Sequence, residues 1–248
     1  MHRFYCARAI FDTPVIRLDD PCEIHHMLHV LRLKKGARVC VFNGLGQEAE
    51  GWLLAVNQHA ADIQIELVRT ATPDPCPEMI LACAIPKKAK FESIIEKCTE
   101  LGVDGIVPLL TERTEVRVDA TRGKHKLQRF QNVAVNAAKQ CGRLTVPVIG
   151  PITKFPDFLS GAGSGNTLLI PCLEGTRRRL ADCLPGGLLT KKIIFMIGPE
   201  GDFTSDELAL AMKNGSQPVS LGSTTLKVDT AAVAVIAFTR LLLCQQPS

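Results

Sequence analysis

KIIFMIGPEGDFTSDEL, residues 192–208, passes from an almost wholly apolar run into a turn that contains two glycines, a proline and a glutamate. A short, continuous apolar run is typical of a strand buried on both faces, which occurs mainly in parallel sheets. Thr204 followed by Glu207 has the spacing of a capping box, so a helix is expected to begin directly after the turn. This order of strand, turn and helix predicts an α/β unit, whose ligands bind beyond the carboxyl ends of the strands.

The residues on both sides of this stretch repeat the alternation of strand and helix. Apolar stripes with a helical period separate short apolar runs, which predicts an α/β fold with a mainly parallel sheet covered on both faces. The strands are expected at residues 79–85, 105–110, 167–172, 192–197 and 218–221. The helices are expected at residues 91–101, 124–140 and 205–214 and from about residue 230 onward.

The first 70 residues have a different pattern, with short β-like segments and one helix at 21–31. Asn43-Gly44 is a hairpin-type turn signal between two of these segments. Three prolines within residues 72–77 predict a stiff linker, because proline neither continues a helix nor pairs within a central strand. We therefore expect a β-rich domain at 1–72, a linker at 73–77 and an α/β domain at 78–248. The expected strands are 2–7, 14–18, 38–42, 47–56 and 60–68.

The composition of the 248 residues is that of a soluble globular protein, with 46% hydrophobic residues, 22% charged residues and a net charge of +4. The chain contains no apolar run of about eighteen residues and no signal-peptide pattern at its start, so a cytosolic location is expected. Its ten cysteines are scattered without a C-x-x-C pair, which favours reduced thiols over disulfides and gives no metal-ligand spacing. His25, His26 and His29 lack acidic or cysteine partners, and no metal site is assigned.

The turn Ile197-Gly-Pro-Glu-Gly201 differs from a phosphate-binding loop, which would carry a lysine. Glu200 and the close glycines suit a neutral or cationic ligand with a planar base. The alternative is that Gly198-Pro199 only ends a strand while Glu200 is solvated. A second glycine turn follows the expected strand at 218–221, with Asp229 or Thr230 as the expected N-cap of the last helix. Two such loops at neighbouring strand ends favour a pocket, whereas the glycine-rich residues 161–165 precede a strand and are interpreted as a linker.

Basic residues cluster in two places, at residues 122–129 and at 86–90. Each cluster alone is more often a solvated surface than a phosphate-binding one. The polar side of the helix at 124–140, which leads through Lys139 and Gln140 to Arg143, adds side chains able to read a nucleotide. Taken together, these features favour a nucleic-acid ligand.

The chain also resembles a known family in motifs spread over nearly its whole length. In the first domain these are Arg3-Phe4, His26, Val30-Leu-Arg32, Lys35-Gly36 and Phe42-Asn-Gly44. In the second domain they are Lys97-Cys-Thr-Glu-Leu-Gly102, Pro108, Thr111-Glu-Arg-Thr114, Gln140-Cys-Gly-Arg143, Pro147, Ile197-Gly-Pro-Glu-Gly201 and Leu221-Gly222. In this order they resemble the RsmE-like 16S ribosomal RNA uridine N3-methyltransferases of the SPOUT class.

The resemblance implies a deep trefoil knot in the C-terminal domain, a small PUA-like or OB-like barrel before it, and a homodimer that acts on 16S RNA of the small ribosomal subunit. It implies S-adenosyl-L-methionine as cofactor. Our hypothesis from the chemistry of uridine N3 is that Arg143 and Arg113 orient RNA phosphate or uracil carbonyls, with Glu200 as a candidate for handling the proton. The implied cofactor residues are Leu173, Glu174, Ile197, Gly198, Pro199, Glu200, Gly201, Leu221, Gly222, Thr225 and Leu226. The candidate RNA-binding residues, taken from the family motifs and the basic clusters together, are Arg3, His26, Arg32, Lys88, Arg122, Lys124, Lys126 and Lys227.

The sequence departs from the family in two places. Arginines and a glutamate are common in the loop written here as residues 222–229, and an acid is usual where Lys139 stands. These differences concern substrate handling more than cofactor binding. They leave two alternatives open, a SPOUT methyltransferase for another RNA position and a noncatalytic RNA-binding factor for ribosome assembly.

Overall fold

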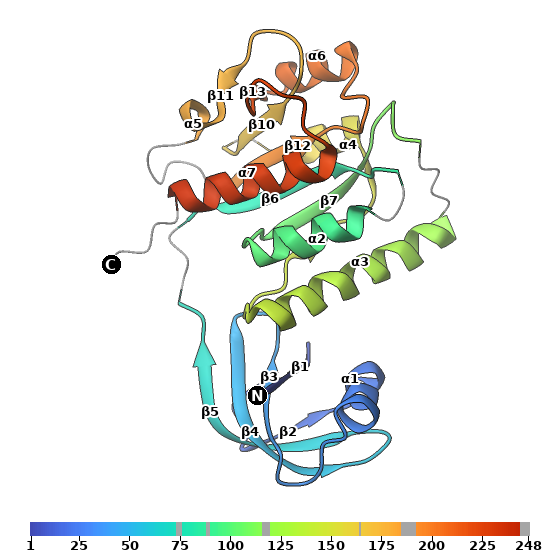
Figure 1. Cartoon of the computed structure of the whole chain (residues 1–248), viewed down its shortest axis with the longest axis vertical. Coiled ribbons are helices and arrows are strands. Elements are labelled where there is room, and N and C mark those ends of the chain that lie inside the picture. Colours follow the sequence, from blue (N-terminus) through green and yellow to red (C-terminus); the bar gives the residue numbers. More distant parts are fainter. Residues whose placement is uncertain (73–75, 88–89, 116–119, 164, 185–191, 244–248) are drawn as a thin grey trace. The chain divides into compact units, whose positions relative to one another are not determined.

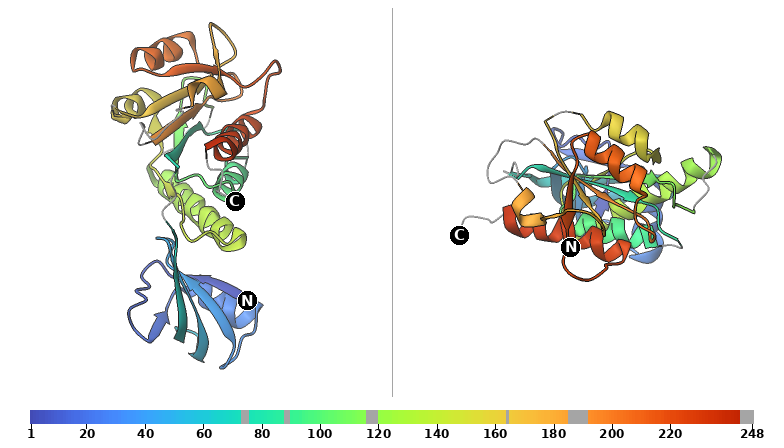
Figure 2. Two further views of the ribbon diagram at one scale, coloured as in Figure 1. Left: turned by 90° about the vertical axis from the view of Figure 1, so that its left-hand side faces the viewer. Right: turned by 90° about the horizontal axis from the view of Figure 1, so that it is seen from above.

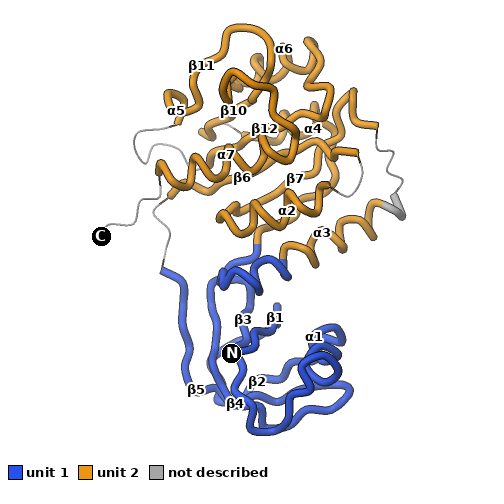
Figure 3. The backbone as a smooth tube through the Cα atoms, viewed as in Figure 1, with its two compact units in different colours: residues 1–73, 135–146 blue, residues 74–134, 147–248 orange. Residues whose placement is uncertain are grey.

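The computed structural model describes residues 1–72, 76–87, 90–115, 120–163, 165–184 and 192–243, and for residues 120–122 the backbone only. The chain forms two compact units (Figure 3). Unit 1 contains residues 1–73 and 135–146, and unit 2 contains residues 74–134 and 147–248. Residues 73–75 of the expected linker lie outside the described residues.

Unit 1 is built on a five-stranded sheet with the order β1-β3-β4-β5-β2 (Figure 1). β1 pairs with β3 in parallel and the other neighbours are antiparallel. The side chains that alternate inward from these strands form one apolar cluster with Ile24 and Met27. The strands are β1 (His2–Tyr5), β2 (Val15–Leu18), β3 (Arg38–Phe42), β4 (Gln47–Val56) and β5 (Ala61–Thr70).

The helix expected at 21–31 consists of two different turns. The carboxylate of Asp20 accepts hydrogen bonds from the amides of Cys22 and Glu23 and so begins α1 (Pro21–His25). The chain then widens into a π-helical turn, η1 (His26–Val30), closed by a bond from the Leu31 amide to the His26 carbonyl. The insertion of a π turn is not visible in the apolar spacing, because it shifts the pattern by a single residue.

The end of the long helix α3 (Ala120–Cys141) and the residues after it belong to unit 1, although the sequence assigned them to the second domain. The guanidinium of Arg3 donates to the carbonyls of Ala138, at 2.8 Å, and Arg143, at 2.9 Å. The Lys139 ammonium lies 2.7 and 2.8 Å from the two carboxylate oxygens of Glu23. These long-range contacts, rather than sequence order, decide which unit contains the segment.

Unit 2 is a parallel sheet with the order β11-β13-β10-β12-β6-β7-β8, and β9 pairs with β7. Helices α2 and α7 cover one face and α4 and α6 the other (Figure 2, left). This confirms the expected α/β fold. The strands are β6 (Glu78–Ala84), β7 (Gly105–Leu110), β8 (Val148–Ile149), β9 (Thr153–Lys154), β10 (Thr167–Pro171), β11 (Arg178–Arg179), β12 (Lys192–Ile197) and β13 (Gln217–Ser220). The remaining helices are α2 (Lys90–Glu100), α4 (Phe155–Gly161), α5 (Leu180–Cys183), α6 (Ser205–Lys213) and α7 (Val228–Leu243).

Three expectations about local features can now be compared with the structure. The capping box is present, since the Thr204 hydroxyl accepts from the Glu207 amide and the Glu207 carboxylate accepts from the Thr204 amide. The last helix begins at Val228, so Asp229 lies in its first turn and is not the N-cap. Cys76 is disulfide-bonded, which corrects the expectation of reduced thiols throughout. The free thiols among the described residues are Cys6, Cys22, Cys40, Cys83, Cys98, Cys141, Cys172 and Cys183.

Within the described ranges, no helix has the length and apolar character needed to cross a membrane.

The buried thiol of Cys98 makes the stability of unit 2 depend on pH in the alkaline range. Complete burial in α2 raises the pKa of its thiol from 9.0 to about 12. Between these values the folded chain keeps a proton that the unfolded chain releases, so the free energy of unfolding falls with rising pH, by about 1.4 kcal/mol per pH unit from this thiol. We expect a shallower decline above pH 9 for Cys98→Ala, measured by urea denaturation at several pH values. Cys22→Ala, at an exposed thiol, is the control, and equal slopes for Cys98→Ala and the wild type would contradict the prediction.

Candidate functional site

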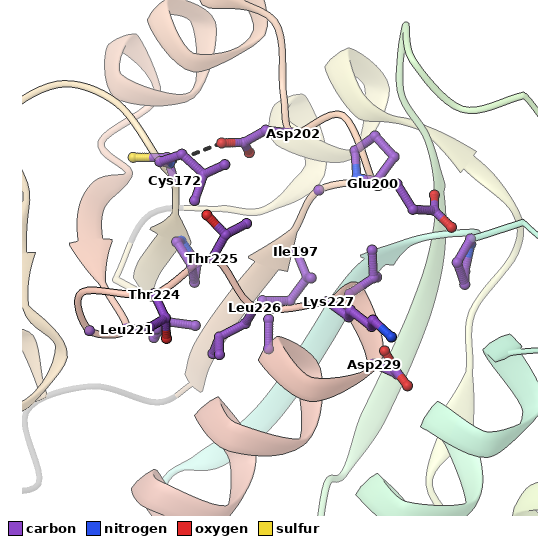
Figure 4. A pocket seen from close by; sticks show the side chains of 18 of the residues that line it. Cys172, Ile197, Glu200, Asp202, Leu221, Thr224, Thr225, Leu226, Lys227 and Asp229 are labelled. Atoms are coloured by element: carbon purple, nitrogen blue, oxygen red, sulfur yellow. Dashed lines mark hydrogen bonds between the residues drawn. The ribbon is translucent and has the colours of Figure 1, made fainter.

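A cavity of about 310 Å³ opens in unit 2 at the carboxyl ends of four strands (Figure 4). Its walls come from the residues after β6, β10, β12 and β13 and from the first turn of α7. β10 lies between β12 and β13, and β6 pairs with the other edge of β12, so neighbouring loops meet over one edge of the sheet. This is the place where open α/β sheets bind ligands.

Most residues that the resemblance assigned to the cofactor lie in these walls. The predicted residues that line the cavity are Leu173, Ile197, Gly198, Pro199, Glu200, Leu221, Gly222, Thr225 and Leu226. Glu174 and Gly201 are exposed and are not part of the lining. Lining residues that the sequence did not indicate include Pro86, Lys90, Cys172, Arg177, Asp202 and Asp229. They were missed because no local pattern marks them as ligand-lining residues; the sequence placed 86–90 in a basic cluster and Asp229 at a helix start.

The turn at residues 198–203 is the most constrained wall of the cavity. A β-carbon at Gly198 would lie 3.1 Å from the ring of Phe203 and 3.2 Å from a carboxylate oxygen of Asp202. The Phe203 ring is buried and packs on Phe155, with ring centroids 4.7 Å apart, so it has little room to move. A side chain at 198 would therefore force the Phe203 ring or the Asp202 carboxylate to shift by a few tenths of an ångström, so glycine is the residue that fits this close turn over the end of β12 without rearrangement.

Arg113 holds the same turn from the other side. Its guanidinium donates to the carbonyl of Gly201 and, at 3.5 Å, to that of Phe203. The neighbouring amide of Glu112 donates to the Glu207 carboxylate at 2.9 Å. The residues at 112–113 thus tie the turn and the start of α6 to the loop after β7, a positioning task that the sequence did not indicate for Arg113.

The charged groups around the cavity are mixed in sign. Lys90, Arg177 and Lys227 line it together with the carboxylates of Glu200, Asp202 and Asp229. Glu200 is exposed and accepts a hydrogen bond from the Lys87 amide at 3.1 Å. One carboxylate oxygen of Asp229 is buried and has no hydrogen-bond partner within the described part of the chain. In Figure 4 Asp229 and Lys227 lie on the α7 side of the cavity.

The walls suit a ligand that combines a planar base with a cationic group. The backbone of the glycine turns lies close to the cavity, and Ile197, Leu221 and Leu226 provide apolar surface. The unpartnered oxygen of Asp229 can accept a hydrogen bond from a donor on a ligand. Burial raises the pKa of the Cys172 thiol in the same wall, and the nearby Asp202 carboxylate adds to the shift.

The candidate RNA-contacting residues of unit 1 differ in their environment. Arg143 donates to the Thr145 hydroxyl at 3.1 Å. Arg3 points inward, with its guanidinium 4.0 Å from the ring centre of Phe42 and 3.3 Å from the Glu48 carboxylate, so it joins parts of unit 1. Two residues of the helical segment complete this set. His26 is half-buried with its ring centroid 6.0 Å from that of Phe4, and Arg32 is exposed in a left-handed conformation with φ of 51°.

The candidate RNA-contacting residues of unit 2 stand on several elements. Lys124 is exposed on α3, and Lys227 is exposed beside the cavity. Lys126 is half-buried 5.9 Å from the Phe130 ring centroid, and burial lowers the pKa of its ammonium group. Lys88 and the side chain of Arg122 lie outside the described residues. Among the residues that are described, no cluster of histidine, cysteine or carboxylate side chains has the arrangement of a metal site.

Comparison with known families gives two matches that divide the chain in the same order. The RNA methyltransferase domain family matches residues 72–240. The RNA methyltransferase PUA domain family matches residues 18–66.

Similar proteins are named accordingly. Ribosomal RNA small subunit methyltransferase E of Synechocystis sp. is 34% identical over 87% of this chain and 69% of its own length. The protein of that name from Rickettsia conorii is 28% identical over 97% and 96% of the two chains. The structure of ribosomal RNA small subunit methyltransferase E from Neisseria gonorrhoeae bound to S-adenosyl methionine is 31% identical over 98% of both chains, with a TM-score of 0.87. A putative methyltransferase of Legionella pneumophila in complex with the same cofactor is 28% identical over 96% of both chains, with a TM-score of 0.86.

Proposed function

The chain belongs to the RNA methyltransferase family, and on that premise we propose that it methylates N3 of a specific uridine in the 16S RNA of the small ribosomal subunit. The observation that carries this proposal is the cavity beyond the strand ends, walled by the Gly198 and Gly222 turns. S-adenosyl-L-methionine is the cofactor, and its base, sulfonium and amine agree with the apolar walls and the orphaned Asp229 oxygen described above.

Several residues would hold the cofactor. Ile197, Leu221 and Leu226 provide apolar contacts, and the glycine turns provide backbone groups for the base. When bound, the cofactor supplies an electrophilic methyl group on a positively charged sulfur. The backbone at Gly198 and Gly222 sets where the ligand lies and so accounts for positioning, which is a large part of the rate advantage in group transfer.

Uridine N3 carries a proton at neutral pH and is a poor nucleophile until that proton is removed or shared. Glu200 is an exposed carboxylate on the rim of the cavity, and we assign to it the task of accepting or sharing this proton. We assign to Arg143 the orientation of RNA phosphate or a uracil carbonyl, where a fixed cation favours the anionic base. Arg113 receives a positioning role, because its guanidinium is bound to the carbonyls of the turn.

Recognition of RNA is assigned to unit 1 together with exposed lysines of unit 2. The family match at residues 18–66 supports an RNA-binding role for this unit. Within it Arg32 is exposed, whereas Arg3 is turned inward and is assigned a structural role. Phosphate contacts from Lys124 and Lys227, both exposed, would add affinity that weakens with salt.

The enzyme is further proposed to act as a cytoplasmic homodimer. The support from this chain is the set of exposed apolar side chains near the end of α7, namely Phe238, Leu241 and Leu242. Sedimentation equilibrium measures the mass of the assembly directly, and a monomer at micromolar concentration would remove this part of the proposal.

The deciding experiment is methyl transfer from labelled S-adenosylmethionine to unmodified small ribosomal subunits and, separately, to naked 16S RNA. The product nucleoside is identified by mass spectrometry. We expect N3-methyluridine, and the ratio of the two rates then identifies the substrate that is recognised. A different methylated nucleoside would favour a methyltransferase for another RNA position. Cofactor binding without transfer would indicate a different RNA, and no cofactor binding would favour a noncatalytic assembly factor.

A further inference from the structure

Asp202 has a backbone conformation that most residues avoid. Its φ is 60°, and apart from glycines it shares a positive φ with only Arg32 among the described residues. Aspartate tolerates this left-handed region better than most side chains, but a cost remains that surrounding contacts must offset. The residue lines the cavity and neither the motifs nor the resemblance gave it a role.

The Asp202 carboxylate joins two walls of the cavity. One oxygen accepts from the Leu173 amide at 2.9 Å, the contact drawn as a dashed line beside Cys172 in Figure 4. The other oxygen accepts from the Phe203 amide at 2.8 Å. Leu173 follows β10 and Phe203 follows β12, so a single side chain links the loops after two adjacent strands. Hydrogen bonds to a charged acceptor are stronger than those between neutral groups.

The two linked walls are not equally anchored. Arg113 and the packed ring of Phe203 already fix the turn at 198–203. The wall after β10 begins at Cys172 and is more open, with Leu173 at 48% exposure and Glu174 exposed. Its other contacts include the bond from the Arg177 guanidinium to the Cys172 carbonyl at 3.1 Å, which lies within the loop itself. Asp202 therefore transmits the rigidity of the anchored turn to the open loop.

We propose that Asp202 is a positioning residue that fixes the Cys172–Arg177 wall against the glycine turn before the ligand arrives. The inference rests on the proposed function in that the ligand is S-adenosylmethionine. A wall that is ordered in advance loses less conformational freedom when the ligand binds. In this left-handed conformation one carboxylate oxygen reaches the Leu173 amide while the other accepts from the Phe203 amide.

The test uses Asp202→Gly, which keeps the positive φ without strain and removes both hydrogen bonds. Asp202→Asn retains one acceptor oxygen, since its amide nitrogen cannot accept from the second backbone amide. Asp206→Asn is the matched control, because Asp206 is an exposed carboxylate in the first turn of α6. The readouts are hydrogen exchange of the Leu173 amide in ligand-free protein, the Kd for S-adenosylmethionine by calorimetry, and kcat and KM in methyl transfer.

For Asp202→Gly we expect at least tenfold faster exchange at Leu173 and a Kd raised about tenfold, the equivalent of one lost charge-assisted hydrogen bond. KM for the cofactor should rise with the Kd, kcat should change less than about twofold, and Asp202→Asn should be intermediate. Unchanged exchange at Leu173, or faster exchange with an unchanged Kd, would overturn the inference. If the wild type binds no cofactor, the proposed function fails, and the exchange rate alone still decides whether Asp202 holds this wall.

Discussion

Replacing Lys139 by alanine is expected to lower the free energy of unfolding by about 3 kcal/mol, because the substitution leaves the Glu23 carboxylate buried without its cation. The side chains of this pair are 15% and 8% exposed, and both oxygens of Glu23 lie within 2.8 Å of the ammonium. The Lys139 nitrogen also lies 5.9 Å from the ring centroid of Phe4, which belongs to the apolar cluster of unit 1. Urea denaturation followed by circular dichroism measures the change.

A matched ion pair in unit 2 provides the control. Lys192 and Glu78 are 2.8 Å apart, but each side chain is 42% exposed. Lys192→Ala should therefore cost less than about 1 kcal/mol. The double variant Glu23→Gln/Lys139→Gln removes both charges and should recover part of the loss seen with Lys139→Ala. Equal costs for Lys139→Ala and Lys192→Ala would show that water screens the Glu23 pair in solution.

Arg143→Ala is expected to reduce kcat for methyl transfer about 100-fold while the Kd for S-adenosylmethionine stays within a factor of two, because losing one fixed donor at a developing anion costs on this order. The main-chain carbonyl of Arg143, not its side chain, accepts the hydrogen bond from Arg3. The hydrogen bond from Arg3 to this carbonyl can therefore still form after the substitution. Single-turnover transfer to small ribosomal subunits, with calorimetry for the cofactor, makes the measurement.

Two further variants separate an effect on RNA from an effect on the cavity. Arg143→Lys retains the charge but not the fork of donors and should recover only part of the rate. Arg113→Ala should instead raise the Kd for the cofactor, because its guanidinium holds the turn through the carbonyls of Gly201 and Phe203. Wild-type transfer by Arg143→Ala would refute the role assigned to that arginine.

The main strands were predictable wherever the sequence contains a compact β-rich run between turn residues. β3, β4, β7 and β12 have the bounds expected from the sequence. β8, β9 and β11 have two residues each. Strands this short form only because a neighbouring strand pairs with them, so no local sequence pattern predicts them. Helix α4 was missed because a proline and a glycine-rich tail obscure its few apolar positions. The trefoil knot stays a prediction.

The cavity was predictable from its glycine turns, because glycine marks places where backbone must come close to something else. The side chains that hold those turns were not predictable. Arg113 and Gly201 are 88 residues apart, and Leu173 and Asp202 are 29 apart. Single-sequence patterns report periodicity and local turns, whereas these contacts depend on which strands become neighbours. The inward orientation of Arg3 has the same origin, since its partners include the distant residues Ala138 and Arg143.

The assignment of residues 135–146 to unit 1 affects how this protein can be cut or recombined. A fragment that ends at residue 72 would contain all five strands of the first sheet, yet it would leave the buried Glu23 without Lys139 and the Arg3 guanidinium without its two carbonyl acceptors. The first unit is thus encoded by two separated stretches. A recombination event that moves this unit into another gene would have to transfer both stretches together. A single crossover at the proline-rich boundary would transfer only the first stretch and so an incomplete unit.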